Sequence, residues 1–412
     1  MSSPVPRDGL RRFIPLMVQG QSLMNRAASA RLDRSACAPG RTRRMSLPIV
    51  DRYPLLATLP HVALGTLPTP VERLHLDTPG LTELWVKRDD LTSTLYGGNK
   101  VRKLDFLLGQ ALAENRRAVI TFGAYGSNHA LATAVHSRKL GLEPHVVLSP
   151  QAPGPFAAAT LRAHAKLGTV IHPVDGWDGA REAVSAKHQL TQRDGVEPLE
   201  IPMGGTSALG AVGYVNAAFE LLGQVDAGQL PLPDAVYVPG GTLGTAIGLA
   251  LGFAAAGVAT RVIAIRVTPD EVANDAFAQK IAAQTVELLR AADPSFPALG
   301  FSDLRFTLRH DWFEPGYGVV TPETSSAVAA AADAHIKLET TYTGKAFAAM
   351  LADAAAGLLG DERVLFWDTY NSAPMPAPGP VELLPQVLQD YVATCDELFG
   401  TVPATTTEGD SE

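Results

Sequence analysis

The sequence predicts an α/β protein in which parallel sheets are covered by helices on both faces. Two observations indicate this class. From about residue 80 onward, short β-branched runs alternate with longer amphipathic or alanine-rich segments, an order typical of parallel sheets buried between helical layers. No period of about 20 to 50 residues repeats along the chain, so a solenoid is not indicated.

The expected elements follow in chain order. Strands are expected at Leu84–Lys87, Ala118–Phe122, His145–Leu148, Val170–Pro173, Ala235–Val238, Val262–Val267 and Val364–Trp367. Helices are expected between them, at Ala130–Leu140, Phe156–Leu167, Ala208–Leu222 and Thr245–Ala256. Several strand-to-helix turns carry Gly, Ser, Thr and Asn, and open α/β sheets bind ligands at the carboxyl ends of their strands. These turns are therefore where a site is expected.

Composition limits the function classes. The 412 residues are 46% hydrophobic and 18% charged, an ordinary globular balance. A net charge of -8 provides no general attraction to nucleic acid or anionic membrane, and neither is expected as a partner. The most apolar run, Ala246–Ala259, is shorter than the roughly 20 residues of a membrane span and is expected to be a buried helix.

Cysteine usage and the two ends of the chain bear on location. Cys37 and Cys395 exclude a disulfide framework and fit a reducing compartment, so a cytoplasmic location is expected. Neither lies in a CxxC pair or beside a histidine cluster, and no metal site is expected. Residues 1–45 hold nine arginines and two acids, which fits either a transit peptide or a disordered, non-native extension before Met45. The lack of an apolar core with a cleavage site favours the second, and residues 401–412 are expected to be a disordered tail.

The first candidate turn is "VKRDDLTSTLYGGNKVRKL", in which Lys100 follows Gly97-Gly98-Asn99 directly ahead of a predicted helix. A lysine amine becomes a Schiff-base nucleophile when it is held near an aldehyde and partly desolvated. A solvated lysine at a helix start is the commoner alternative for such a residue considered alone.

The second turn is "TFGAYGSNHA", where a strand leads into Ser127, Asn128 and His129 at a helix start. Backbone N–H groups and a serine hydroxyl at a helix N-terminus bind carboxylate or phosphate. Ser127 or Asn128 as a simple N-cap is the alternative, although two polar side chains and an imidazole exceed what a cap needs.

The third turn is "VYVPGGTLGTAIGLALG". Gly240 and Gly241 turn the chain, and a helix is expected to start near Thr242–Thr245. Glycines permit close approach of the backbone to an anion, and threonine hydroxyls add donors. The stretch is neither a Walker A loop nor a GxGxxG motif with its ribose-binding acid. The expected ligand of this turn is a phosphate group that is not part of a nucleotide.

The fourth region combines "TTYTGKAFAAML" with "FWDTYNS", which offer the hydroxyls of Tyr342, Thr343 and Thr369. Turn and capping roles are the alternative for each of them alone. Together, a lysine, a phosphate loop and neutral hydroxyls at strand-to-helix turns favour pyridoxal phosphate, which needs a lysine Schiff base and a phosphate site.

Five stretches, "KRDDLTSTLYGGNKVRKL", "TFGAYGSNHA", "MGGTSALGAVGYVNAAFEL", "VPGGTLGTAIGL" and "YTGKA", together resemble the D-cysteine desulfhydrase and 1-aminocyclopropane-1-carboxylate deaminase family. The resemblance runs from about Pro68 to Val392, with the motifs in the expected order. It implies the tryptophan synthase β-like (fold type II) architecture, with pyridoxal phosphate between two parallel-sheet domains. The larger domain is then 46–105 with 213–400, the smaller one is 106–212, and the protein is a homodimer.

The resemblance also implies residue roles. Lys100 would form the Schiff base, and Asn128 would hydrogen-bond the cofactor's phenolic oxygen. Ser127, with the following Asn128 and His129, would hold the carboxylate of a small amino-acid substrate. The phosphate would be held by Gly240, Gly241, Thr242, Leu243, Gly244 and Thr245. Tyr317 and Tyr342 match two tyrosines on the substrate side, and with Lys100 and Ser127 they form the expected catalytic set.

Two positions bear on the reaction. Deaminases resemble "YEGK" where this chain has Thr343, so a neutral hydroxyl rather than a glutamate would face the pyridine nitrogen. A carboxylate holds that nitrogen protonated and deepens the electron sink. Thr369 matches a hydroxyl where deaminases have leucine. Both favour a β-eliminating lyase that converts D-cysteine to pyruvate, hydrogen sulfide and ammonia. The alternatives are a deaminase that releases 2-oxobutyrate and ammonia, and a non-catalytic pyridoxal-phosphate-binding protein.

One departure from the family concerns the substrate. Where the family commonly reads "HTGG", this chain reads Asp368-Thr369-Tyr370-Asn371. A ring and an amide in place of two glycines are expected to narrow or reshape the pocket, and the resemblance therefore leaves the natural amino acid and its handedness open.

Overall fold

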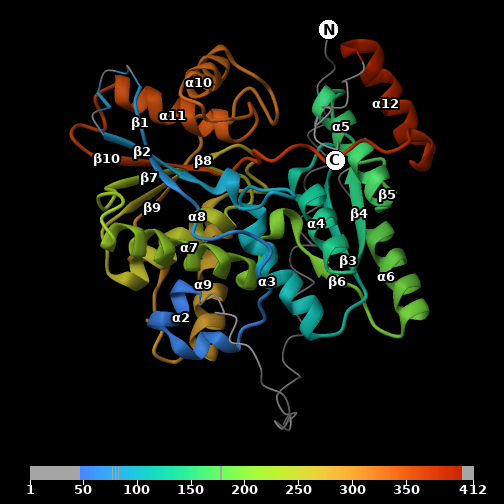
Figure 1. Cartoon of the computed structure of the whole chain (residues 1–412), viewed down its shortest axis with the longest axis horizontal. Coiled ribbons are helices and arrows are strands. Elements are labelled where there is room, and N and C mark those ends of the chain that lie inside the picture. Colours follow the sequence, from blue (N-terminus) through green and yellow to red (C-terminus); the bar gives the residue numbers. More distant parts are fainter. Residues whose placement is uncertain (1–46, 77, 79, 82, 177–178, 401–412) are drawn as a thin grey trace, which may run out of the picture.

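The computed structural model describes residues 47–400 except 77, 79, 82, 177 and 178. The expectations for residues 1–45 and 401–412 lie outside this range. Two sheets lie side by side, as Figure 1 shows. No helix of the described residues is long and apolar enough to cross a membrane.

The larger sheet has six strands in the order β1-β2-β10-β7-β8-β9. Their bounds are β1 Val71–Leu74, β2 Glu83–Arg88, β7 Ala235–Gly240, β8 Arg261–Arg266, β9 Phe306–Arg309 and β10 Arg363–Asp368. Every pairing is parallel except the one between β1 and β2. The prediction of a parallel sheet is thus confirmed for its centre, and an antiparallel edge strand is added to it.

The smaller sheet has four parallel strands in the order β5-β4-β3-β6. They are β3 Ala118–Ala124, β4 Glu143–Ser149, β5 Val170–Pro173 and β6 Leu199–Ile201. All seven residues of β3 are buried, as expected for a central parallel strand covered on both faces.

Helices cover both faces of the larger sheet. Alternate residues of its strands face two separate hydrophobic clusters, in accordance with the two-residue period of a strand. One face packs against α3 Lys100–Ala113, α7 Ala208–Asp226, α8 Gly244–Ala256 and α9 Asp275–Ala292. The other face packs against α10 Pro322–Asp333 and α11 Thr343–Ala355. The short helix α2, Pro48–Arg52, packs against α7.

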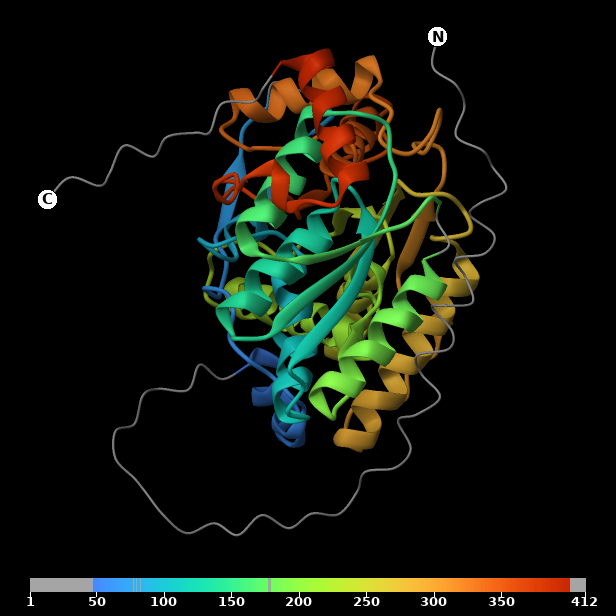
Figure 2. The ribbon, with the colours of Figure 1, turned by 90° about the vertical axis from the view of Figure 1, so that its right-hand side faces the viewer.

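The smaller sheet is covered by α4 Asn128–Lys139, α5 Pro155–Leu167, α6 Ala180–Asp194 and α12 Gln386–Phe399. Figures 1 and 2 show the C-terminal helix α12, in red, beside α5. Its buried residues Leu388, Val392 and Cys395 share a hydrophobic cluster with Leu161 of α5. The C-terminal helix therefore packs on the smaller sheet, although the expected division placed it with the larger domain.

Helix α3 lies where the two sheets meet. Its buried residues share one cluster with α7 of the larger sheet and with α4 and β3 of the smaller one. Short 3-10 helices complete the structure at Pro54–Thr58, Asp89–Leu91, Met203–Gly205, Phe301–Asp303 and Val381–Leu383. Because α3 begins at Lys100, this packing places the first candidate residue at the junction.

Candidate active site

The turn ahead of Lys100 is held by three consecutive backbone hydrogen bonds. The N–H of Gly97 donates to Oδ1 of Asn371 at 2.6 Å, and the N–H of Gly98 donates to the carbonyl of Asp89 at 3.0 Å. The N–H of Asn99 donates to the carbonyl of Thr369 at 3.1 Å. These acceptors follow β2 and β10, which are neighbours in the sheet, so the sheet itself holds the turn.

Gly98 is required by this geometry. Its φ is +86°, a region that side chains rarely adopt. A Cβ at this position would lie 2.6 Å from the carbonyl oxygen of Tyr370 and 2.9 Å from that of Thr369. The Gly-Gly-Asn turn is therefore a rigid platform for the residue that follows it.

The Lys100 amine is held by polar groups of its own turn. Its Nζ donates to Oδ1 of Asn99 at 2.8 Å, and Nδ2 of Asn99 donates to Oγ1 of Thr245 at 3.0 Å. Burial lowers the pKa of Lys100 to about 8, while the charge of Glu339 acts in the opposite direction. A large neutral fraction near pH 8 makes this amine a nucleophile and a base.

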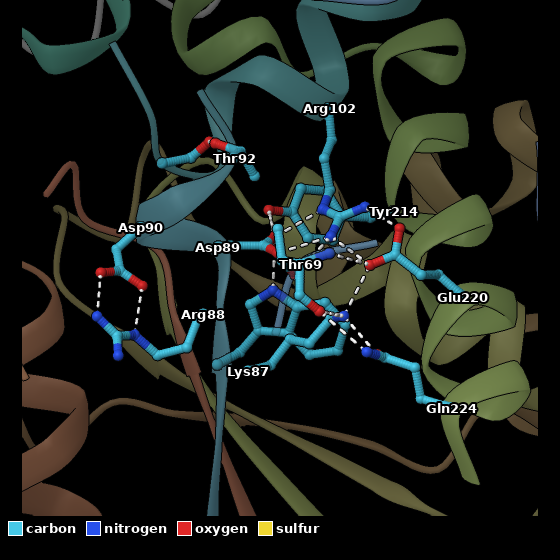
Figure 3. Close-up of polar contacts among 12 residues, drawn as sticks. Thr69, Lys87, Arg88, Asp89, Asp90, Thr92, Arg102, Tyr214, Glu220 and Gln224 are labelled. Atoms are coloured by element: carbon cyan, nitrogen blue, oxygen red, sulfur yellow. Dashed lines mark hydrogen bonds and ion pairs between the residues drawn. The ribbon is translucent and has the colours of Figure 1, made fainter. Parts of the chain in front are cut away.

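A buried ion network lies behind the turn (Figure 3). The Asp89 carboxylate accepts hydrogen bonds from Arg102, from Tyr214 Oη at 2.7 Å and from Trp367 Nε1 at 2.7 Å. The same Arg102 also donates to Glu220.

Lys87 completes the network. Its Nζ donates to Glu220 at 2.7 Å and to Gln224 at 2.6 Å. Lys87 and Arg102 balance the charges of Asp89 and Glu220, as buried charges require. The network joins β2, α3 and α7. Its member on α3 is Arg102, which lies two residues after Lys100. Sequence reasoning missed it because its members are spread over almost 300 positions.

The β3–α4 turn brings Ser127 and Asn128 to the start of α4. Ser127 is the N-cap, and its Oγ accepts from the N–H of Ala130 at 3.2 Å, so the capping alternative describes its observed contact. The hydroxyl hydrogen still has a donor role available. Oδ1 of Asn128 accepts from the hydroxyl of Tyr96 at 2.6 Å.

His129 is directed toward the sheet. It is buried, and its Nε2 lies 2.8 Å from Oγ1 of Thr121 on β3. Burial, with the charges of Lys100 and Lys103, holds its pKa well below the usual range, so the imidazole is neutral. Its observed contact is structural, and a substrate-binding role for His129 stays a prediction.

The β7–α8 loop is the one expected to hold the phosphate. Leu243 is in the left-handed region at φ 59°, which turns the chain into the first residues of α8. Oγ1 of Thr242 lies 2.6 Å from Oγ1 of Thr206. A Cβ on Gly241 would lie 3.1 Å from the ring of Tyr342, so this loop and the fourth region converge.

Lys103 lies at the same place, and sequence reasoning missed it. Its Nζ donates to the carbonyl of Gly204 at 3.1 Å and to Oγ1 of Thr206 at 3.3 Å. A Cβ on Gly244 would lie 3.1 Å from this Nζ. Burial, with the charge of Lys100, lowers its pKa well below the usual value. The signal in the sequence is its spacing, since a residue three positions after Lys100 lies on the same helix face.

Tyr317 and Tyr342 meet as a hydroxyl pair. Their Oη atoms are 2.8 Å apart, and the two rings are nearly perpendicular. Burial raises the pKa of both phenols, so both stay protonated. The loop that carries Tyr317 is held by Lys345, whose Nζ donates to the carbonyls of Phe313 and Gly316 at 3.1 Å each.

Thr343 begins α11 and is fully buried. Its hydroxyl accepts from the N–H of Glu339 at 3.0 Å. The Glu339 carboxylate in turn accepts from the N–H groups of Thr341, Tyr342 and Thr343 at 2.7, 2.7 and 2.8 Å. A carboxylate thus caps the helix that presents Tyr342, and sequence reasoning missed it, although an acid just ahead of a helix is a capping signal.

The "DTYN" departure has a definite structural role. The Asn371 amide binds Gly97, as described above, and does not merely replace a small residue. The Tyr370 ring lies 5.5 Å from the Lys337 amine. Asp368 is buried, and its Oδ2 has no partner among the described residues. Burial, together with the nearby Asp90 charge, raises the pKa of Asp368 well above its usual range.

A single ligand can account for the environments of both Lys100 and Lys103. Lys100 is an amine whose pKa is lowered to about 8, and Lys103 is a buried amine whose Nζ donates to the carbonyl of Gly204 and the hydroxyl of Thr206. An aldehyde that carries a phosphate fits both residues, because the aldehyde would react with the first amine and the phosphate would pair with the second at a helix N-terminus. Pyridoxal phosphate is such a molecule, and these residues fit it.

Comparison with known proteins supports this class. The family described as pyridoxal-phosphate dependent enzymes matches residues 62–369, and the chain belongs to that family. It is 32% identical over 330 residues to the D-cysteine desulfhydrase of Klebsiella pneumoniae (strain 342), a match that covers 77% of this chain and 96% of the relative. The cofactor prediction is confirmed by these matches.

Solved structures agree on the fold. The crystal structure of an ACC deaminase homologue superposes with a TM-score of 0.65 at 28% identity, covering 85% of this chain and 100% of the other. A hydrogen sulfide-producing enzyme from Fusobacterium nucleatum gives a TM-score of 0.51 at 16% identity, covering 75% of this chain and 96% of the other, which shows a shared fold alone. The predicted fold class is confirmed.

Proposed function

We propose that this pyridoxal-phosphate enzyme is a β-eliminating lyase of the D-cysteine desulfhydrase type, which converts D-cysteine and water to pyruvate, hydrogen sulfide and ammonia. The structural observation that carries the proposal is the Lys100 amine, presented by a rigid turn with a pKa of about 8. The near full-length similarity to a D-cysteine desulfhydrase supports the substrate class.

Lys100 has two tasks in this reaction. The bound cofactor supplies an aldehyde for the substrate amine and an electron sink for the carbanion. Once Lys100 Nζ is free of the cofactor, it takes the proton from Cα of the substrate. A pKa of about 8 suits a general base near pH 8, because roughly half of the amine is unprotonated there and the proton is still bound well.

The helix starts hold the anionic groups. The N-terminus of α4, with the Ser127 hydroxyl and Asn128, would bind the substrate carboxylate. Gly240 to Thr245, with Lys103, would bind the cofactor phosphate. The two anions would then each lie at a helix N-terminus, one at α4 and one at α8.

The tyrosine pair serves the leaving group. Tyr317 and Tyr342 share a hydrogen bond of 2.8 Å and stay protonated, so one of them can donate a proton to the departing thiolate.

A deaminase of 1-aminocyclopropane-1-carboxylate is the second candidate. Two observations favour it: the similarity to the ACC deaminase homologue, and the Glu339 carboxylate whose charge acts on Lys100 and on both tyrosines. The expected position of Thr343 and Thr369 as neutral groups opposite the cofactor ring favours elimination instead, whereas the observed contacts of the Thr343 hydroxyl are with Glu339. A protein that binds the cofactor without turnover is the third candidate.

One experiment separates the three. Purified protein is incubated with D-cysteine, L-cysteine, β-chloro-D-alanine and 1-aminocyclopropane-1-carboxylate, and sulfide, pyruvate and 2-oxobutyrate are measured. The lyase forms pyruvate from β-chloro-D-alanine much faster than 2-oxobutyrate from the cyclopropane. The opposite preference overturns the lyase in favour of the deaminase. Retained cofactor with no product from any substrate overturns both enzymes.

We also propose the domain boundaries, the location and the oligomeric state of the protein. Residues 46–105 and 213 to about 380 form the larger domain, and 106–212 with the C-terminal helix form the smaller one, as the packing of α12 on α5 supports. The protein is proposed to be a cytoplasmic homodimer. The family resemblance is what supports the homodimer. Light scattering on the protein as it leaves a size-exclusion column measures its mass, which should be twice the chain mass of 43.5 kDa for a dimer.

A further inference from the structure

Tyr96 links the Lys100 turn to the other sheet. The residue is 1% exposed and stands directly before Gly97. Its hydroxyl donates to Oδ1 of Asn128 at 2.6 Å, and its backbone carbonyl lies 2.9 Å from Nε2 of His136 on α4. No role was predicted for it from the sequence.

The contact decides which way the Asn128 amide faces. An asparagine amide has one oxygen, which accepts, and one NH2 group, which donates. Burial raises the pKa of the Tyr96 hydroxyl well above its usual value, so it remains a donor. In the structure the hydroxyl donates to Oδ1 at 2.6 Å, and the NH2 group of Asn128 is thereby turned away from Tyr96.

We propose that Tyr96 is a positioning residue, which holds the Asn128 amide with its NH2 group toward the phenolic oxygen of bound pyridoxal phosphate. The inference rests on the proposed function for the location of that oxygen. Without the hydroxyl, the amide is free to rotate and to present its oxygen to an anionic oxygen, which is unfavourable.

The arrangement has an electrostatic consequence. A donated N–H stabilises the anionic phenolic oxygen and so lowers the pH at which the cofactor bound to Lys100 loses its proton. Loss of the donor raises that pH. The titratable groups that act on Tyr96 or contact it are Glu339, Tyr370 and His136. These three are unchanged in a Tyr96→Phe variant, which removes one oxygen atom and keeps the ring.

The test uses four variants of the cofactor-loaded enzyme: Tyr96→Phe, Asn128→Ala, the two combined, and Tyr237→Phe. Tyr237 is the matched control, because it is also buried and its hydroxyl donates to Asp353, between β7 and α11. The pH midpoint of the visible cofactor band and the dissociation constant of pyridoxal phosphate are measured for each. Circular dichroism establishes that each variant is folded.

Tyr96→Phe is expected to raise the midpoint by about 0.5 to 1 pH unit, the scale of one hydrogen bond to an anion. Cofactor binding should weaken by roughly 3- to 10-fold. Asn128→Ala should shift the midpoint at least as far, the double variant no further than Asn128→Ala, and Tyr237→Phe not at all.

Three results overturn the inference: a wild-type midpoint in Tyr96→Phe, a wild-type midpoint in Asn128→Ala, or additive shifts in the double variant. Failure of the proposed function looks different. A wild-type protein with no visible band, or a Lys100→Ala variant that keeps the wild-type band, places the cofactor elsewhere.

Discussion

The side-chain oxygen of Asn371 accepts a hydrogen bond of 2.6 Å from the backbone N–H of Gly97, across 274 residues of sequence. The same oxygen accepts from the N–H of Ala373 at 3.1 Å, and the amide nitrogen donates to the Ala373 carbonyl at 3.0 Å. The segment after β10 is thus closed on itself and holds the turn that presents Lys100.

Asn371→Ala should destabilise the protein. It leaves the buried N–H of Gly97 without its acceptor, which costs about 1–3 kcal/mol. Urea unfolding measures the loss, and turnover should fall with it because the turn loosens. Asn371→Asp is the control, since it keeps an acceptor oxygen and should retain more of both. Equal stability of the alanine variant and the wild type would remove this role from Asn371.

Lys100→Ala should abolish both the visible cofactor band and turnover, because the variant has no amine to react with the aldehyde. Absorbance after dialysis and pyruvate formation are the two measurements. Lys139→Ala changes an exposed lysine at the end of α4 and should behave as wild type in both. Full activity in Lys100→Ala contradicts the assignment.

Glu339→Gln should lower the pKa of Lys100 below its present value of about 8, because the carboxylate charge stabilises the ammonium form. Glutamine still accepts hydrogen bonds from the start of α11, so the helix cap is largely kept. The readout is the rate at which apoprotein takes up pyridoxal phosphate as a function of pH.

For wild type, this uptake rate should rise with pH and reach half its maximum near pH 8, since only the neutral amine reacts. The midpoint should move to lower pH in Glu339→Gln. The pKa shift of Lys100 also makes the stability of the fold depend on pH. Lys100 has a lower pKa in the folded protein than its ordinary 10.5, so its burial destabilises the fold below pH 8, and this cost fades as the pH rises from about 8 toward 10.5. An unchanged or higher midpoint in Glu339→Gln would show that its charge does not act on Lys100.

Arg102→Met should cost about 3–5 kcal/mol of folding free energy, because Asp89 and Glu220 would remain buried with Lys87 as their one cation. Arg193→Met is the matched control. Arg193 is exposed where it pairs with Glu143, and its loss should change the stability far less. Chemical denaturation measures the free energy of unfolding of both variants. Equal decreases would show that the buried network stabilises the fold no more than the exposed ion pair does.

Gly241→Val should weaken cofactor retention. The new Cβ would lie 3.1 Å from the ring of Tyr342, and the branched side chain would fill the space into which the phosphate is proposed to fit. Gly223→Ala on α7 is the control, because its Cβ meets no atom within 4 Å. Cofactor occupancy after dialysis is the measurement. Unchanged occupancy in Gly241→Val places the phosphate elsewhere.

Sequence alone was enough for the features that depend on neighbouring residues. The central strands were predicted because both of their faces are buried, which gives a continuous apolar run, as in β3. The edge strands β1 and β9 and the three-residue β6 were missed, since short, half-exposed segments carry no such run. The turn before Lys100 and the glycine loop before α8 were found because glycine and a helix start leave a local pattern.

Tertiary structure decided which further groups meet at these turns. Tyr96 contacts Asn128, Lys103 contacts Gly204, and Asn371 contacts Gly97 over separations of 32, 101 and 274 residues. Such contacts leave no periodic signal, because they arise only when parallel strands bring the ends of distant segments to one edge. The sequence by itself therefore identified the class of the cofactor and singled out Lys100 as the lysine expected to bind it. The folding of two sheets around α3 determined what holds that lysine, what lowers its pKa and what surrounds the phosphate loop.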